Sequence, residues 1–203
     1  MSRTPDQALR SELIALARED LRVREELVAT GELFDGYHPR MEQVHKGNAG
    51  RLKEIVDQHG WPGRSIAGDD GANAAWLILY HDIGEPEFMR ACLPMICLAA
   101  LHAELRLVQA AMLVDRIRFY EGNPPIYGTN YDWDETGQIS PTPIEDPARV
   151  DGLRKSAGLS PLGVDIIAKR KLLLEENANP PLDINAYRRQ AEEWYQRVGW
   201  RTR

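Results

Sequence analysis

The fold is decided by residues 72–82, which read ANAAWLILYHD. The run from Ala72 to Tyr80 is almost entirely apolar and rich in alanine, the strongest helix former. It is too short to span a bilayer, which takes about 20 apolar residues. These features predict a buried central helix that ends at His81 and Asp82.

Amphipathic helices are expected N-terminal to this run. Apolar residues recur with a helical period from Pro5 to Thr30 and from Pro39 to His59. The second helix stops at a Gly-Trp-Pro-Gly turn, residues 60–63, because a proline disfavours helical geometry at the residue before it. Residues 64–71 are expected to form a loop. The expected core positions of the two helices are Leu9, Leu13, Leu16, Leu21 and Leu27, then Met41, Val44, Leu52, Ile55 and Val56.

A long helical pattern and a long loop follow the central run. The helix begins at Pro86, reaches about His102 and continues to Tyr120, either after a break near Ala103 or without one. Residues 122–146 are rich in Gly, Pro, Thr and aromatic residues and have no period. They predict a long ordered loop with a short hairpin around the Thr-Gly pair 136–137.

The whole pattern predicts a mainly α protein. Helical patterns resume in residues 147–157, 161–176 and 183–198, and no alternating strands, dinucleotide-binding turn or internal repeat occur. A chain of 203 residues can bury a core without a disulfide or metal. We expect a single compact multi-helix domain over residues 1–203, with a peripheral C-terminal helix from about residue 183.

Charge and composition argue against several classes of partner. The net charge of −6 is spread without a basic stripe, so neither nucleic acid nor a membrane is expected to bind. Cys92 and Cys97 point to different faces of a predicted helix and are expected to be reduced thiols. No signal-peptide pattern opens the sequence. We expect a cytoplasmic protein with a small-molecule ligand or substrate, and a homodimer stays open.

Short motifs keep a fixed order along most of the chain from Leu9 to Leu162. They are Asn48, Gly60-Trp61-Pro62, Ser65, His81, Glu104, Asp115-Arg116, Gly122, Tyr127-Gly128-Thr129, Pro143, Asp146-Pro147 and Gly158-Leu159-Pro161-Leu162. This series resembles a bacterial family catalogued only as a domain of unknown function. Its pattern is a Gly-Trp-Pro turn, a Gln-His helix end, Asp-Arg and a Tyr-Gly-Thr-Gln loop. The resemblance implies almost nothing about activity.

Three positions depart from that family pattern. Tyr80 and Asn130 stand where the family has glutamine, which changes side-chain reach beside the expected site. Ala103 stands where a glycine commonly precedes the glutamate, and this change favours one continuous helix. No substrate is therefore carried over from a relative.

His81 is the first candidate catalytic residue. An imidazole titrates near neutral pH, and an adjacent carboxylate such as Asp82 can fix its tautomer and raise its basicity. The structural alternative is that His81 caps its helix and interacts favourably with the negative helix end.

Glu104, Asp115 and Arg116 are expected in one helical stretch. Eleven residues separate the two carboxylates, about three turns, so both can face one side as catalytic residues. Arg116 can bind a substrate carboxylate or phosphate through its fork of donors. The alternative is a structural salt bridge to another helix.

Tyr127, Thr129 and Asn130 are the candidate substrate-binding residues of the long loop. They offer a phenol, a hydroxyl and an amide on a backbone that a glycine keeps open. A set of this kind suits the orientation of a small polar ligand. The alternative is an ordered loop that the tyrosine pins to the core.

The five histidines show no metal-binding motif. None has His-x-x-x-His or Glu-x-x-His spacing, and the cysteines lack Cys-x-x-Cys spacing. We therefore expect no metal and no cofactor, unless ligands assemble from separate helices. His38 and His45 are expected at the surface or in a loop, and His59 at the end of its helix.

Together these residues predict a hydrolase or lyase that acts on a small polar metabolite. In this hypothesis His81 transfers a proton, Glu104 or Asp115 orients or polarises the substrate, and the other candidates hold it in the same cavity. Two alternatives stay open. One is a non-catalytic ligand-binding or protein-interaction module, and the other is a metal-dependent helical enzyme.

Overall fold

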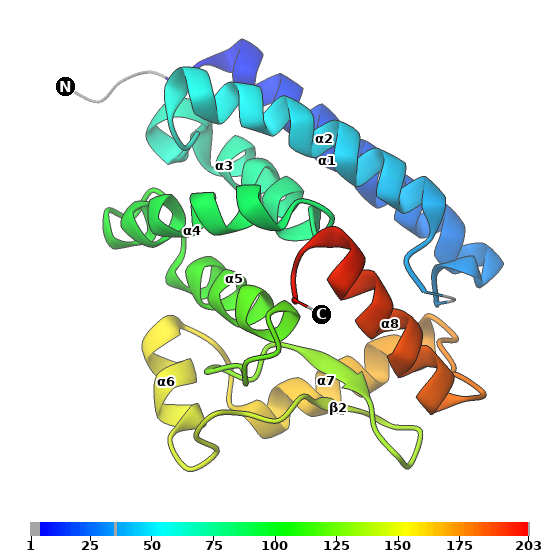
Figure 1. The fold of residues 1–203 in the computed structure, drawn as a ribbon. Coiled ribbons are helices and arrows are strands. Elements are labelled where there is room, and N and C mark those ends of the chain that lie inside the picture. The colour runs from blue at the N-terminus through cyan, green and yellow to red at the C-terminus, as the bar shows by residue number, and fades with distance from the viewer. Residues whose placement is uncertain (1–4, 35, 203) are drawn as a thin grey trace. The chain divides into compact units, whose positions relative to one another are not determined.

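The computed structural model describes residues 5–34 and 36–202. This part of the chain forms eight α-helices, one short 3-10 helix and one two-stranded antiparallel sheet (Figure 1). The prediction of a mainly α protein is confirmed. No helix among these residues is long and apolar enough to cross a membrane. The elements are α1 (Gln7–Thr30), η1 (Glu32–Phe34), α2 (Pro39–His59), α3 (Arg64–His81), α4 (Pro86–Leu101), α5 (Leu107–Tyr120), β1 (Tyr131–Trp133), β2 (Ile139–Pro141), α6 (Val150–Ala157), α7 (Leu162–Glu175) and α8 (Ile184–Val198).

These elements gather into two compact units. The first comprises Met1–Glu26 and His38–Ala110, and the second comprises Leu27–Tyr37 and Ala111–Arg203. The expectation of a single domain over residues 1–203 stays a prediction.

In the first unit, α1 and α2 run beside each other in opposite directions (Figure 1). Near one end of the pair, Glu12 Oε1 lies 2.5 Å from Arg51 Nε. Near the other end, Glu26 Oε2 lies 2.7 Å from Arg40 Nη2. Residue numbers that rise along α1 therefore meet numbers that fall along α2, which defines an antiparallel pair.

The predicted central helix forms the buried middle of this unit as α3, which packs against α2. Ala75, Ile78 and Leu79 have almost no exposed surface. The helix is longer than predicted, because residues 64–71 are helical and not a loop. A kink at Gly68, with φ of 72° and ψ of 171°, interrupts the helical geometry there.

α4 and α5 are separate helices. Ala103 lies between them with φ of 55°, in the left-handed region that favours glycine. The alternative of one continuous helix is therefore wrong. Because α5 begins only at Leu107, the expectation that Glu104 belongs to the same helical stretch as Asp115 is wrong as well.

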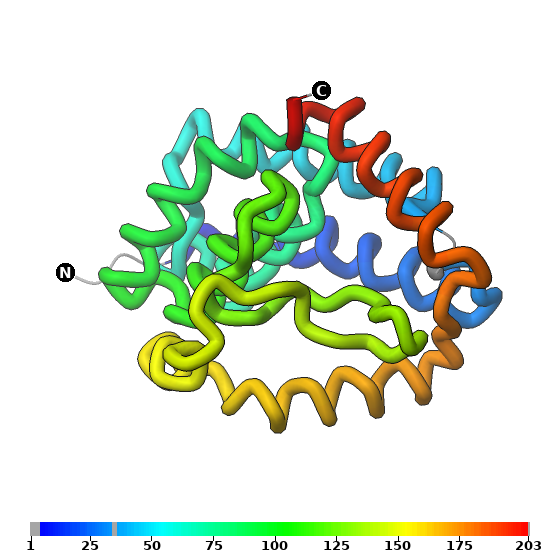
Figure 2. Tube along the Cα trace, turned by 60° about the horizontal axis from the view of Figure 1, so that its bottom comes forward, coloured from blue at the N-terminus to red at the C-terminus, as the bar shows by residue number. Residues whose placement is uncertain are grey.

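In the second unit, the predicted long loop carries the predicted hairpin. β1 pairs antiparallel with β2, and Trp133 lies opposite Ile139. Figure 2 shows the hairpin running beside α7, and Arg170 Nε of α7 donates a 3.0 Å hydrogen bond to the carbonyl of Ile139. Both the ordered loop and the hairpin are confirmed.

Aromatic residues tie the C-terminal helix α8 into the second unit. Trp200, just beyond α8, is buried and stacks on Tyr120 with ring centroids 5.1 Å apart. The guanidinium of Arg201 lies 4.5 Å from the ring centroid of Tyr195. The chain end thus contributes to the packing of this unit.

Candidate functional site

His81 is the last residue of α3, and its ring contacts the carboxylate of Asp20 on α1. His81 Nδ1 lies 2.9 Å from Oδ2 and 3.1 Å from Oδ1 of Asp20. Asp20 has 0% exposed surface, whereas 22% of the His81 side chain is exposed. The carboxylate that orients His81 is therefore Asp20, from a distant part of the sequence, and not the adjacent Asp82.

His45 on α2 joins this pair as a third member. Its Nε2 lies 3.4 Å from Oδ2 of Asp20, and its ring centroid lies 5.3 Å from that of His81. The expectation that His45 lies at the surface or in a loop is wrong, because only 8% of it is exposed. We call Asp20, His45 and His81 the Asp-His-His centre. By contrast, His59 ends α2 as predicted.

The Asp20 carboxylate is held in its charged form by the two imidazoles. Burial by itself raises the pKa of Asp20. Hydrogen bonds and charge interactions with His45 and His81 lower the pKa by more than burial raises it. The net pKa lies well below the ordinary range of a carboxyl group. A fully buried anion is therefore present at neutral pH.

Asp82 has the opposite electrostatic character. Burial, and then the nearby charge of Glu85, raise the pKa of the Asp82 carboxyl to about 8. It is therefore largely protonated at neutral pH and is poorly suited to stabilise a charged imidazole.

Asp20 and His45 occupy core positions of their helices, which explains how the sequence analysis missed them. The predicted stripe of α1 includes Leu21, which is 42% exposed, while the neighbouring Asp20 is buried in line with Leu13 and Val23. A charged or titratable residue on an apolar helical stripe is the signal that identifies both.

A side-chain hydrogen bond fixes the two helices next to this centre. Asn48 Nδ2 donates to the backbone carbonyl of Leu16 at 3.1 Å. Asn48 follows His45 by about one turn of α2, and Leu16 precedes Asp20 by about one turn of α1. The motif residue Asn48 thus sets the register in which Asp20 meets His45.

Glu104 caps the other end of α3. Its Oε2 accepts a 2.6 Å hydrogen bond from the backbone N–H of Ser65, in the first turn of the helix. The straight part of α3 from Asp69 to His81 alone covers roughly 18 Å at 1.5 Å per residue. The structure therefore does not bring Glu104 to His81.

Asp115 anchors the long loop inside the second unit. Its side chain is fully buried and accepts hydrogen bonds from the N–H groups of Ile126, Tyr127 and Thr129 at 2.7–3.1 Å. The hydroxyl of Thr129 adds a fourth donor at 2.9 Å. These contacts are those of a structural anchor, and they differ from the predicted interhelical salt bridge.

The opposite side of the same loop is held by Arg154, a fully buried residue of α6 that the sequence analysis missed. Arg154 Nη1 donates to the carbonyls of Tyr127 and Gly128 at 2.7 and 3.2 Å, and Nη2 lies 3.0 Å from Asp165 Oδ2. Gly128 has φ of 63°, and an added Cβ would lie 2.8 Å from Ile144. The backbone of the Tyr-Gly-Thr motif and its glycine thus have a structural explanation.

The remaining candidates also belong to the second unit. Arg116 follows Asp115 on α5 and is half-buried. Asn130 is buried, and its carbonyl accepts a 3.0 Å hydrogen bond from the N–H of Thr142. Because His81 belongs to the first unit, the expected common cavity of all these residues stays a prediction, as does substrate binding by Arg116, Tyr127, Thr129 and Asn130.

A groove of about 400 Å³ lies in the first unit. Its wall on α3 includes Leu77, which lies one turn before His81 on the same helix face. Arg18 and Arg106 bring two guanidinium groups to the groove, together with side-chain amides. Asp70 and several apolar side chains also line it, so the groove suits a partly apolar ligand that carries an anionic group.

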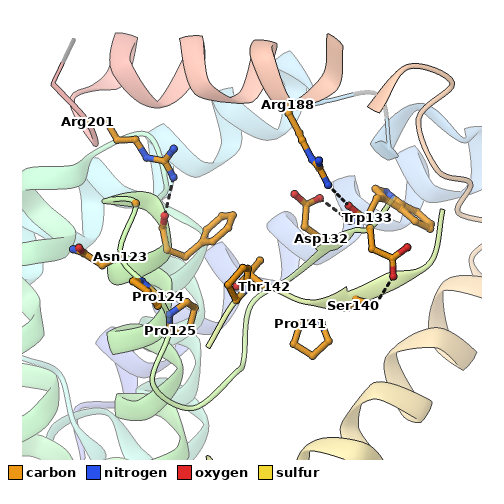
Figure 3. Close-up of a pocket in the computed structure, with 14 residues that line it drawn as sticks. Asn123, Pro124, Pro125, Asp132, Trp133, Ser140, Pro141, Thr142, Arg188 and Arg201 are labelled. Atoms are coloured by element: carbon orange, nitrogen blue, oxygen red, sulfur yellow. Dashed lines mark hydrogen bonds between the residues drawn. The ribbon is translucent and has the colours of Figure 1, made fainter. Parts of the chain in front are cut away.

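A pocket of about 600 Å³ lies in the second unit (Figure 3). Both of its guanidinium groups are engaged, since Arg188 donates to the carbonyl of Trp133 at 3.2 Å and Arg201 to that of Tyr120 at 2.9 Å. Prolines form much of its wall, and none of its lining residues is a histidine or cysteine. The pocket offers shape and apolar surface, and its acidic side chains are those of Asp132 and Asp134.

The fold and the site define a mainly α protein with a buried carboxylate held between two imidazoles. The chain belongs to the family of unknown function DUF6624, whose model matches residues 5–176. The expected membership of an uncharacterised family is confirmed. No curated protein and no solved structure matches the chain.

Proposed function

We propose that the protein is a small cytoplasmic enzyme, a hydrolase or lyase, whose first unit performs acid–base chemistry on a small polar metabolite. The observation that carries this proposal is the contact of His81 Nδ1 with both carboxylate oxygens of buried Asp20. A carboxylate at one ring nitrogen fixes the tautomer of an imidazole and stabilises its charged form. The chemistry then takes place at the solvent-facing edge of His81.

The burial of Asp20 supports a functional role for the centre. Moving a carboxylate out of water costs several kcal/mol, and the two imidazoles only offset this cost. An apolar side chain would fill the same core position without that cost. Arrangements of this kind are concentrated at functional sites, because selection keeps them for their chemistry.

The groove that contains Leu77 supports a substrate class with an anionic group. It lies on the helix face that leads to His81, and Arg18 and Arg106 line it. Guanidinium groups bind carboxylates and phosphates through paired hydrogen bonds. Hydrolysis or elimination of a small metabolite that carries such a group is the reaction class that these residues favour.

Incubation of the pure protein with mixtures of small metabolites tests this function. We expect turnover by the wild type and by His102→Ala, a control histidine that is exposed at the end of α4. His81→Ala and Asp20→Asn should lower the rate by roughly 10²-fold or more, because general acid–base catalysis contributes 10²–10⁴-fold. Turnover that survives both changes would contradict the proposal.

A non-catalytic ligand-binding role is the second candidate function. The pocket of about 600 Å³ in the second unit favours it, because its volume is typical of small-molecule sites and no histidine or cysteine lines it. Under this proposal a ligand protects the indole of Trp133 from fluorescence quenching. A ligand whose binding is unaffected by Trp133→Ala would contradict it.

A further inference from the structure

We propose that Asp20, His45 and His81 form a binding site for one divalent transition-metal ion, for which Zn²⁺ is the best candidate. Metal binding by itself goes beyond the proposed function. The task of the ion in catalysis rests on that function.

Two of the three separations between the ligand atoms match those of a metal site. The three atoms all lie within 4.8 Å of one another. His45 Nε2 and His81 Nδ1 lie 3.4 and 2.9 Å from Asp20 Oδ2. Ligands bonded to zinc at about 2.0–2.1 Å in a tetrahedral arrangement are roughly 3.3 Å apart, so both separations match to within about 0.5 Å.

The chemistry of the donors selects the kind of ion. Two imidazole nitrogens and one carboxylate oxygen suit zinc and its first-row neighbours, whereas magnesium and calcium prefer oxygen ligands alone. Three protein ligands also leave one position of a tetrahedral ion open, as in catalytic rather than structural zinc sites.

The surroundings of the centre favour a site with one accessible side. Asp20 and His45 are buried, while His81 is partly exposed, so solvent approaches from the His81 side. The three ligands come from three different helices, α1, α2 and α3, and the Asn48 hydrogen bond fixes two of them. Ligands on packed helices are already oriented before an ion binds.

A bound ion would supply an activated water molecule as an acid–base group in addition to His81. Such an ion would lower the pKa of a bound water far below that of bulk water, toward about 7. Asp20, His45 and His81 would hold the ion.

Direct metal titration of the full chain tests the site without any substrate. Protein stripped of metal with a chelator is titrated with Zn²⁺ by calorimetry and with Co²⁺ by visible absorption. We expect one ion per chain for the wild type and for His102→Ala, with the intense d–d bands of four-coordinate cobalt. Asp20→Asn, His45→Ala and His81→Ala should each raise the dissociation constant by at least about 100-fold, because each removes a direct ligand.

Circular dichroism and thermal melting verify that each variant is folded. His81→Gln is a second variant for the partly exposed position, since it preserves side-chain length and polarity without an imidazole. Wild-type affinity in every folded variant, or no ion bound by the wild type, would overturn the site.

The metal site and the proposed function can fail separately. Full turnover by metal-stripped protein would overturn the catalytic task of the ion and leave the acid–base proposal standing. Tight binding of one ion without turnover of any metabolite supports the metal site and contradicts the enzyme.

Discussion

At the scale of single residues, buried polar side chains account for much of what is unusual in this sequence. The Asp115 carboxylate accepts hydrogen bonds from N–H groups in and next to the Tyr-Gly-Thr segment. The Arg154 guanidinium donates hydrogen bonds to carbonyls of the same segment. A loop segment with buried peptide groups needs such partners, because an unpaired buried polar group destabilises the folded state. Neither residue needs to touch a substrate to be essential.

Asp115→Asn is expected to lower the free energy of unfolding by about 2 kcal/mol. The amide has a single acceptor oxygen in place of two, so buried N–H groups of the loop lose a charged partner. Chemical denaturation measures this change. Asp69→Asn, at a side chain that is 81% exposed, is the matched control and should change stability by less than about 0.5 kcal/mol.

Ala103→Gly is expected to raise the free energy of unfolding by about 1 kcal/mol. Ala103 has φ of 55°, and a left-handed conformation costs a residue with a Cβ about 1–2 kcal/mol, part of which the greater chain entropy of glycine cancels. Ala91→Gly, at an exposed position inside α4, should have the opposite sign. Equal destabilisation by the two changes would contradict the backbone argument.

At the scale of secondary-structure elements, the α1–α2 pair provides the framework of the Asp-His-His centre. Both helices were predictable from their apolar period, and α2 has the predicted bounds, Pro39–His59. The rotation of each helix about its axis was not predictable in the same way. The predicted apolar face of α1 included Leu21, although the buried residue is its neighbour Asp20. One residue corresponds to about 100° around the helix, so this error placed Asp20 outside the predicted buried face.

Asn48→Ala tests the register of this pair. Asn48→Ala removes the hydrogen bond that joins α2 to α1 at Leu16 and leaves a gap at a buried side chain, so the free energy of unfolding should fall by about 1–2 kcal/mol. If the centre binds metal, Co²⁺ affinity should fall about 10-fold as well, because supporting contacts orient the ligands. Gln43→Ala, exposed on α2, is the control and should change neither quantity.

At the scale of the whole molecule, the chemistry-bearing residues separate into two groups. The first unit contains the Asp-His-His centre and the Glu104 cap. The second contains the loop that Asp115 and Arg154 hold, and the pocket of Figure 3. The two motif residues Asp115 and Tyr127 therefore belong to loop structure, and the motif residue His81 belongs to the candidate reaction centre.

The pH dependence of stability should reveal the partly buried Asp132 of that pocket. Burial raises its pKa, although a hydrogen bond from the Trp133 N–H and the charge of Arg188 oppose this. The folded state then keeps a proton that the unfolded chain releases, so stability falls as pH rises above the ordinary carboxyl pKa of about 3.9. Asp132→Asn removes this effect.

Denaturation midpoints at pH 4 and pH 7 measure the difference. The wild type should lose more stability than Asp132→Asn over this interval, and other titrating groups cancel in the comparison. A larger loss in the variant would show that the carboxyl is ionised more easily in the folded protein.

The sequence by itself determined the mainly helical class and the bounds of helices such as α2, because local period, proline and glycine signals act within a few residues. It did not determine the start of α3, where residues 64–71 are helical. It also indicated His81, whose place at the end of an apolar run is visible locally. Only the tertiary structure decided that Asp20 and His45 complete the centre and that Asp115 serves the loop. These partners lie on separate elements, and their meeting depends on helix rotation and packing, which no local pattern encodes.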